Sequence, residues 1–141
     1  TQAKTLFPYT TLFRSTMLAG LINAALPHQK IIGISALKGH VGLEKDIQSI
    51  LPLSKKNTPF SVLHEYHFGG YAKHPTNLIN WMNELWQAEN LPTDIVYTSK
   101  LLFAVKDLIE KQFFSSHDQL LIIHSGGLQG NLSLPPNTLS F

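Results

Sequence analysis

The sequence contains no cysteine and few charged residues. The absence of Cys from its 141 residues excludes a disulfide framework, a thiolate nucleophile and a Cys-ligated metal, and we therefore expect a cytoplasmic protein. Charged residues make up only 14% of the chain, well under the quarter or so that is usual in soluble domains. A low charge content is typical of a chain whose surface is partly covered by a partner or by other parts of the same protein.

Long apolar runs, internal repeats and basic patches are also missing. No run approaches the roughly 18 residues of a membrane helix, so no membrane contact is expected. The formal net charge is only +2 and the seven His are scattered, so nucleic acid is not an expected partner. The chain is nevertheless 43% hydrophobic, which permits a real core, and its length suits one domain or part of a larger one.

Apolar residues recur in patterns that alternate between helix and strand. The periodicity predicts helices over residues 16–26, 41–51, 75–90 and 97–114, and buried strands over 30–36, 60–68 and 119–125. This alternation indicates an α/β fold with a partial parallel sheet and flanking helices. Ligands of such sheets bind beyond the carboxyl ends of the strands. The glycine loop at 126–130, directly after the third expected strand, is therefore a candidate site.

One segment does not fit this alternation. Residues 5–15, TLFPYTTLFRS, have no clear period and precede a regular helical pattern that starts at Thr16. Back-translated codon by codon, the segment resembles a common short-read sequencing adapter. We therefore interpret residues 1–15 as a non-native leader and expect the biological sequence to begin near Thr16. Like a fusion scar, such a leader is not expected to be part of the native fold.

Five stretches together carry a resemblance to a known family. They are TMLAGLINAALP (16–27), IIGISALKG (31–39), HFGGYAK (67–73), DIVYTSKLLFAVKDLI (94–109) and IIHSGGLQG (122–130). Their order and spacing resemble the 1-aminocyclopropane-1-carboxylate deaminase and D-cysteine desulfhydrase family. That resemblance implies a tryptophan synthase β-like fold, a pyridoxal 5'-phosphate cofactor, a small amino-acid substrate and a homodimer. Residues 16–141 would be the C-terminal part of such an enzyme.

The resemblance assigns several residues to the cofactor. Thr16 matches the last residue of the loop that cradles the cofactor phosphate at a helix N-terminus, where orphan N–H groups favour an anion; a plain helix cap is the alternative. Ser125 matches the hydroxyl that hydrogen-bonds the pyridine nitrogen, and Gly126 and Gly127 would let the backbone approach the cofactor. The alternative for Ser125 is a capping residue in a turn.

The resemblance aligns Thr98 with a position where cyclopropane deaminases have a carboxylate near the pyridine nitrogen of the cofactor. A carboxylate keeps that nitrogen protonated and strengthens the electron sink of the ring. A neutral hydroxyl supports the sink less, which suits α,β-elimination of a good leaving group such as sulfide. Thr98 therefore favours a desulfhydrase-like reaction over opening of a cyclopropane.

Two tyrosines are the expected catalytic residues. Tyr97, in VYTSK, matches the family tyrosine that faces the substrate above the cofactor ring, where a phenol can bind the substrate or transfer a proton. Tyr71, in GGYAK, matches a second tyrosine near the substrate. A core tyrosine at a helix start is the alternative for Tyr97. His64 and His67 suggest a metal only weakly, because residues three apart in a strand point to opposite faces, and no metal is expected.

The combined interpretation is a PLP-dependent lyase or deaminase of the desulfhydrase type that yields a keto acid and ammonia. None of the lysines after Thr16 stands in a context that matches the family's Schiff-base lysine, which such catalysis requires. We therefore expect this chain to be inactive by itself. Two alternatives remain: a 1-aminocyclopropane-1-carboxylate deaminase, and a non-catalytic α/β module that binds a ligand or a partner.

Overall fold

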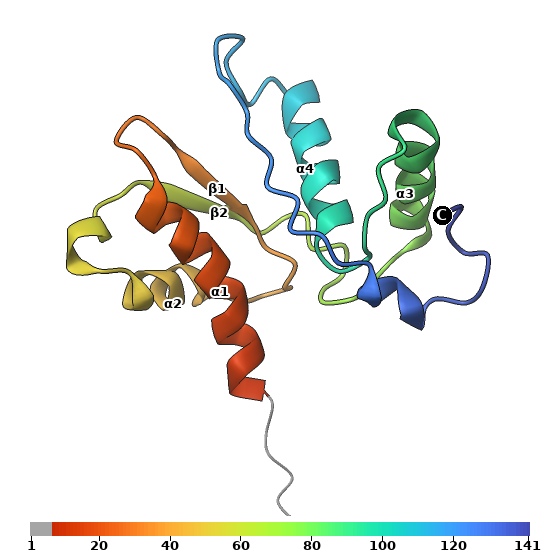
Figure 1. Ribbon diagram of the computed structural model, residues 1–141, viewed down its shortest axis with the longest axis horizontal. Helices are drawn as coiled ribbons and strands as arrows, with labels where there is room; N and C mark the ends of the chain where they lie inside the picture. The colour runs from red at the N-terminus through yellow and green to blue at the C-terminus, as the bar shows by residue number, and fades with distance from the viewer. Residues whose placement is uncertain (1–6) are drawn as a thin grey trace, which may run out of the picture. The chain divides into compact units, whose positions relative to one another are not determined.

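The computed structural model describes the backbone of residues 7–141 and the side chains of residues 16–141. The chain divides into two compact units (Figure 1). Unit 1 runs up to Gly33 and includes Gly39–Leu63, and unit 2 consists of Ile34–Lys38 and His64–Phe141. Residues 1–6 of the expected leader lie outside the described residues, and only the backbone of its residues 7–15 is described.

Unit 1 is a small α/β layer. Strands β1 (Ile31–Ile34) and β2 (Phe60–Leu63) form a two-stranded parallel sheet. Helices α1 (Phe7–Ala24) and α2 (Leu43–Ile50) pack against each other and the sheet, and η1 (Leu53–Lys55) follows α2. The buried core contains Ala19, Ile22, Leu43, Ile47 and Leu51, with Ile31, Phe60 and Val62 packed against it. The expected α/β class is confirmed at this level.

The start of α1 differs from the expectation. The helix begins at Phe7, so Thr16 lies in the helix interior rather than at its cap. A helix needs only continuous backbone hydrogen bonding, and residues 7–15 contain only one Pro, which is tolerated in a first turn. Irregular apolar spacing in this stretch was therefore a poor guide to its backbone conformation.

Unit 2 contains two α-helices and a short 3-10 helix joined by irregular segments. Helix α3 (Thr76–Glu89) follows Pro75 and ends at Asn90, whose left-handed conformation (φ 53°) is a common helix terminus. Helix α4 (Thr98–Glu110) is followed by a long irregular stretch and the short helix η2 (Gln129–Ser133). Leu78 and Met82 of α3 are fully buried, together with residues 95–96. The predicted helices 75–90 and 97–114 are thus confirmed, the second with an earlier end.

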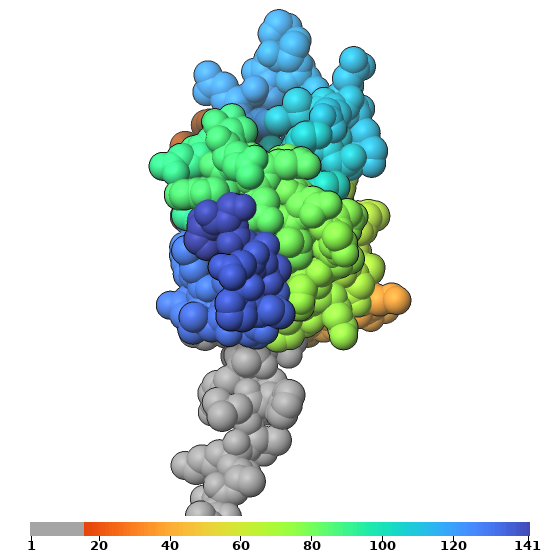
Figure 2. Space-filling view, turned by 90° about the vertical axis from the view of Figure 1, so that its right-hand side faces the viewer, coloured from red at the N-terminus to blue at the C-terminus, as the bar shows by residue number. Residues whose placement is uncertain are grey.

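The C-terminal segment covers one side of α3. The Asn83 amide donates to the carbonyl oxygen of Thr138 at 3.2 Å and accepts from the backbone N–H of Ser140 at 2.8 Å. The rings of Trp86 and Phe141 lie 5.3 Å apart. Figure 2 shows this contact, with the dark-blue C-terminal residues against green α3. Leu134, Leu139 and Phe141 therefore pack against the core of unit 2, although the sequence of this segment shows no period.

Two predicted strands are corrected. The expected strand over 60–68 ends at Leu63, and the expected strand over 119–125 is irregular and exposed rather than buried. Leu121 is 84% exposed and Ile122 and Ile123 are each 40% exposed. A strand requires a neighbour for its backbone groups, and within the described residues the sheet contains only β1 and β2. Apolar β-branched residues alone were therefore insufficient to form this strand.

No helix of the described residues combines the length and apolar character needed to span a membrane.

Candidate functional site

The two predicted catalytic tyrosines lie together in unit 2. The ring centroids of Tyr71 and Tyr97 are 6.2 Å apart, with the ring planes tilted by 57°. Both rings are accessible, with exposed fractions of 50% for Tyr71 and 40% for Tyr97. The residues are 26 positions apart in the sequence, so the fold and not the local chain brings them together. This pair is the centre of the candidate site.

Asp94 fixes the helix start that carries Tyr97. Its buried carboxylate accepts the backbone N–H of Val96 at 2.9 Å, of Tyr97 at 3.2 Å and of Thr98 at 2.8 Å. The first N–H groups of a helix have no partner within the helix, and a carboxylate there also interacts favourably with the helix dipole. Asp94 therefore occupies the donors at the N-terminus of α4 and holds the backbone of Tyr97.

Thr98 takes part in the same buried cap. Its hydroxyl donates to Asp94 Oδ1 at 2.8 Å and accepts the backbone N–H of Asp94 at 2.8 Å. The residue is only 1% exposed. In this arrangement the hydroxyl is engaged by the turn and supports the helix start that carries Tyr97, and its predicted place near a cofactor remains a prediction.

The segment that carries Tyr71 runs along α4. The Tyr66 hydroxyl donates to Asp107 Oδ2 at 2.7 Å, and the rings of Phe68 and Phe103 meet edge to face with centroids 4.9 Å apart. Desolvation, followed by the hydrogen bond to Asp107, raises the pKa of Tyr66 to about 12. The hydrogen bonds from Lys111 and then Tyr66 lower the pKa of Asp107. The segment is thus tied to α4 at its start and in its middle.

The turn before Tyr71 has an unusual backbone. Gly69 (φ 93°) and Gly70 (φ 128°) lie at positive φ, and so do Phe68 (φ 50°) and Ala72 (φ 53°). Glycine adopts such angles readily, but a residue with a side chain is disfavoured there by about 1–2 kcal/mol. The turn therefore contains strain that the surrounding contacts must offset.

Lys100 supplies the strongest of these contacts. Its ammonium donates to the carbonyl oxygen of His67 at 2.9 Å and to that of Gly70 at 2.7 Å. The residue is only 1% exposed. Burial lowers the pKa of Lys100 to about 8, although the negative charge of Asp94 opposes the shift. A buried ammonium is costly unless it is hydrogen-bonded, and here two backbone carbonyls satisfy it.

The lowered pKa of Lys100 predicts a pH-dependent stability. Between about pH 8 and the ordinary lysine pKa near 10.4, the unfolded chain binds a proton that the folded chain has released, so the free energy of unfolding rises with pH. From pH 7.5 to 9.5 we expect a rise of about 1–2 kcal/mol in wild type relative to Lys100→Met. Urea titrations followed by tryptophan fluorescence report on unit 2, because both Trp residues lie in α3. Parallel pH curves for the two proteins would contradict the assignment.

The loop before α4 is also held from the C-terminal side. The Asn131 amide oxygen accepts the backbone N–H of Ile95 at 3.0 Å, and its amide nitrogen donates to the carbonyl oxygen of Thr93 at 2.9 Å. A Cβ placed on Gly130 would lie 2.9 Å from Val96 Cγ2 and 3.1 Å from Asp94 Oδ2. Gly130 therefore permits a close approach of η2 to the cap of α4.

Gly130→Ala is expected to destabilise unit 2 by about 1–3 kcal/mol, as overpacking of a tight contact does. The Asp94 carboxylate cannot move aside without loss of its hydrogen bonds to α4. The measurement is the free energy of unfolding from urea titration. Gly20→Ala is the control, because nothing lies within 4 Å of a Cβ placed there and a helical Ala is about 0.5–1 kcal/mol better than Gly. A Gly130→Ala protein as stable as wild type would show that η2 adjusts freely.

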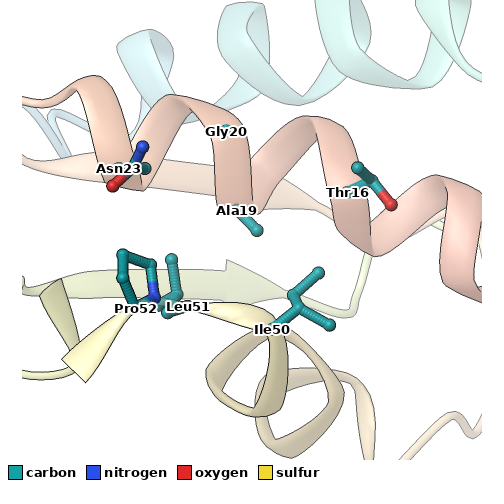
Figure 3. A pocket seen from close by; sticks show the side chains of 7 residues that line it. All are labelled: Thr16, Ala19, Gly20, Asn23, Ile50, Leu51 and Pro52. Carbon is teal, nitrogen blue, oxygen red and sulfur yellow. The ribbon is translucent and has the colours of Figure 1, made fainter.

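Thr16 lines a pocket in unit 1. The pocket lies between one side of α1 and the end of α2, and Figure 3 shows Thr16, Ala19, Gly20 and Asn23 facing Ile50, Leu51 and Pro52. None of these lining residues is charged. Because Thr16 is in the helix interior, its surrounding N–H groups are used by the helix itself. The structure therefore places no helix start at Thr16, and its predicted contact with the cofactor phosphate remains a prediction.

Ser125, Gly126 and Gly127 lie in an exposed turn of unit 2. Gly126 (φ 73°) and Gly127 (φ 84°) have backbone angles that favour glycine, and the Gly126 N–H donates to His124 Nδ1 at 3.2 Å. The turn is thus a local structure, and its predicted contact with a cofactor remains a prediction.

Sequence reasoning missed Asp94 and Lys100. A signal for Lys100 was present, because Tyr97, Lys100, Phe103 and Asp107 recur at intervals of three or four residues and so share one side of α4. A polar side chain in this row gives no apolar periodicity, and so periodicity alone does not indicate its burial. The signal for Asp94 was its place four residues before Thr98, ahead of an apolar run, where a capping residue is expected.

The chain is similar to two curated proteins. It is 28% identical over 134 residues to the protein named "Putative 1-aminocyclopropane-1-carboxylate deaminase" of Pyrococcus furiosus, an alignment that covers 88% of this chain and 40% of that protein. A protein of the same name from Pyrococcus abyssi is 24% identical over 106 residues, which cover 71% of this chain and 32% of the relative. The chain thus spans less than half the length of these relatives. No protein-family model and no solved structure matches it.

Proposed function

We propose that this chain supplies the substrate-facing part of a PLP-dependent lyase that acts on a small amino acid. The reaction proposed is a desulfhydrase-like α,β-elimination, which yields a keto acid and ammonia, and also sulfide when the substrate is D-cysteine. The observation that carries the proposal is the pairing of Tyr71 and Tyr97 in one accessible site. The similarity to two proteins named as cyclopropane-carboxylate deaminases supports the same chemical theme.

The described residues do not by themselves fit the whole cofactor. Thr16 offers no helix start to a phosphate, the Thr98 hydroxyl is engaged by Asp94, and Ser125 lies in an exposed turn. When bound, PLP supplies an electron sink for the substrate α-carbon. We therefore assign the chain only those roles that its own side chains can perform.

Those roles belong to the two phenols. A tyrosine O–H can donate a hydrogen bond to a substrate carboxylate or transfer a proton to a reacting atom. Tyr97 is the better candidate for proton transfer, because Asp94 fixes its backbone at the start of α4. Tyr71, carried by a glycine turn, is the better candidate for contact with the substrate. Binding beside the two rings, whose centroids lie 6.2 Å apart, would also exclude water from one side of a small amino acid.

The proposal is tested on the protein that the source DNA encodes, after long-read sequencing across the codons of residues 1–16. Sulfide release from D-cysteine is the expected result. Release of 2-oxobutanoate from 1-aminocyclopropane-1-carboxylate, without sulfide, would favour the deaminase alternative. Because the resemblance aligns Thr98 with a position where cyclopropane deaminases have a carboxylate, we expect the first product to predominate. We further propose a homodimer, which sedimentation of the same protein would test.

Borohydride reduction in the presence of PLP distinguishes the PLP enzyme from the non-catalytic alternative. A labelled lysine in the assayed protein supports the enzyme, because covalent PLP catalysis requires a Schiff-base lysine. If no lysine is labelled and neither substrate gives a product, the enzyme assignment would be rejected in favour of a ligand-binding module.

A further inference from the structure

Residues on one side of α4 contact the segment from Tyr66 to Tyr71 along its length. Asp107 accepts from Tyr66, Phe103 contacts Phe68, Lys100 binds the turn at 67–70, and Tyr97 faces Tyr71. The order is antiparallel, since contacts move toward the N-terminus of α4 as the segment proceeds. The segment thus delivers Tyr71 to the end of the helix where Tyr97 lies.

Among these contacts, Lys100 alone binds backbone groups on both sides of the glycine pair. His67 O precedes Gly69 and Gly70, and Gly70 O belongs to the peptide that leads into Tyr71. The ring contact of Phe68 with Phe103 fixes no backbone group of the turn, and the Tyr66–Asp107 hydrogen bond lies nearly three helical turns away from Tyr97. The turn also carries Phe68 at positive φ, and Ala72 just beyond it is at positive φ as well, so its shape depends on such a clamp.

We propose that Lys100 is a positioning residue that sets Tyr71 opposite Tyr97 by clamping the 67–70 turn. Lys100 acts through the backbone of the turn and does not itself touch substrate. The catalytic consequence rests on the proposed function, because it assumes that a substrate binds at the tyrosine pair. The positional effect of Lys100 stands without that assumption and can be measured without activity.

The experiment measures the proximity of the two phenols in the full chain. Brief photo-oxidation with a ruthenium complex couples neighbouring tyrosines, and mass spectrometry quantifies the peptide that links residues 71 and 97. Tyr71→Phe identifies the product by removing it. The test variant is Lys100→Met, which keeps the length of the side chain without the charge or donors. Lys106→Met, on the same helix, is the matched control, because Lys106 is half-exposed and pairs with Glu110.

We expect the 71–97 product to fall about tenfold in Lys100→Met, since a hydrogen bond from a charged donor is worth about a factor of 10 or more. Hydrogen exchange of the Gly70 and Lys73 amides should rise by a similar factor. Lys106→Met should change neither. Unchanged coupling in a folded Lys100→Met protein overturns the proposal.

Folding must be separated from positioning. Lys100→Met should retain the cooperative melting transition of unit 2, which Trp81 and Trp86 report. If it does not fold, Lys100→Gln, which keeps one amide donor group, should fold and give an intermediate yield. A Lys100→Gln protein that also fails to fold would show that Lys100 is required by the fold as a whole, and the positioning role would be rejected.

The same variants separate this proposal from the proposed function. If coupling falls but the sequenced full protein releases no product even as wild type, Lys100 positions the tyrosines and the enzyme assignment fails. If wild type is active, Lys100→Met should lose activity in parallel with coupling, and Lys100→Gln should recover part of both. A reduced PLP adduct on Lys100 itself would overturn the proposal, because it would place Lys100 in the chemistry and not behind it.

Discussion

Asp94→Ala should destabilise unit 2 by about 3 kcal/mol, the largest stability loss expected for a single side chain of the site. The substitution leaves three backbone N–H groups and the Thr98 hydroxyl without the buried carboxylate that now accepts them. Hydrogen bonds to charged groups contribute about 1.5–3 kcal/mol each, although such contributions do not add fully. Urea titration with tryptophan fluorescence measures the effect.

Asp118→Ala is the matched control for Asp94→Ala. Asp118 also accepts a backbone N–H, that of Ser115 at 2.8 Å, but in an exposed turn. We expect its loss to cost less than about 1 kcal/mol. Asp94→Asn should lie between, because an amide keeps one acceptor oxygen. Equal losses for Asp94→Ala and Asp118→Ala would mean that water replaces the carboxylate and that the α4 cap is not buried in solution.

Tyr97→Phe should lower kcat of the assembled enzyme by about 100-fold, within the range by which a positioned proton-transfer group contributes. The phenyl ring can keep the contact with Tyr71, so stability should change little.

Tyr71→Phe should raise KM more than it lowers kcat, because that phenol is assigned to substrate contact. The assay is initial-rate release of sulfide from D-cysteine by the protein encoded across the resequenced start.

Phe113→Leu serves as the control for general damage, since it removes a half-exposed ring beyond the far end of α4. It should retain wild-type kcat and KM. If Tyr97→Phe retained full kcat as well, Tyr97 would be reassigned to packing, and the resemblance on which its role rests would carry no catalytic information for this chain.

The sequence predicted those parts of the fold that depend on local patterns. Helices α3 and α4 follow from regular apolar spacing and from turn residues such as Pro75 and Asn90. The apolar residues of α4 are only partly buried: Leu108 is buried, whereas Ile109 is 53% exposed. Lys100 and Thr98 are buried in its first turn instead, because polar groups can be buried when hydrogen-bonded. Such pairing depends on residues distant in sequence and cannot be obtained from periodicity.

The predicted strand over 119–125 shows where local sequence patterns fail to predict the fold. The residues at 119–125 have the composition of a buried strand, yet they pair with no strand in the described part of the chain. Strand formation depends on a partner more than on intrinsic preference. The tyrosine pair was predicted by resemblance and could not have been predicted from spacing, because Tyr71 and Tyr97 meet only through the antiparallel course of the 66–71 segment.

Because the 66–71 segment runs antiparallel to α4, the spacing of residues along α4 determines which contacts the segment can make. Deleting one residue between Tyr97 and Asp107 would rotate the helix by about 100° per residue and shift it by about 1.5 Å, so the contacts of the 66–71 segment could not all be kept. Single substitutions affect one contact at a time, whereas a change of length would affect the register of every contact. The length of α4, and not only its composition, therefore constrains how this site can vary, while the irregular and mostly exposed residues 113–128 can change length without altering that register.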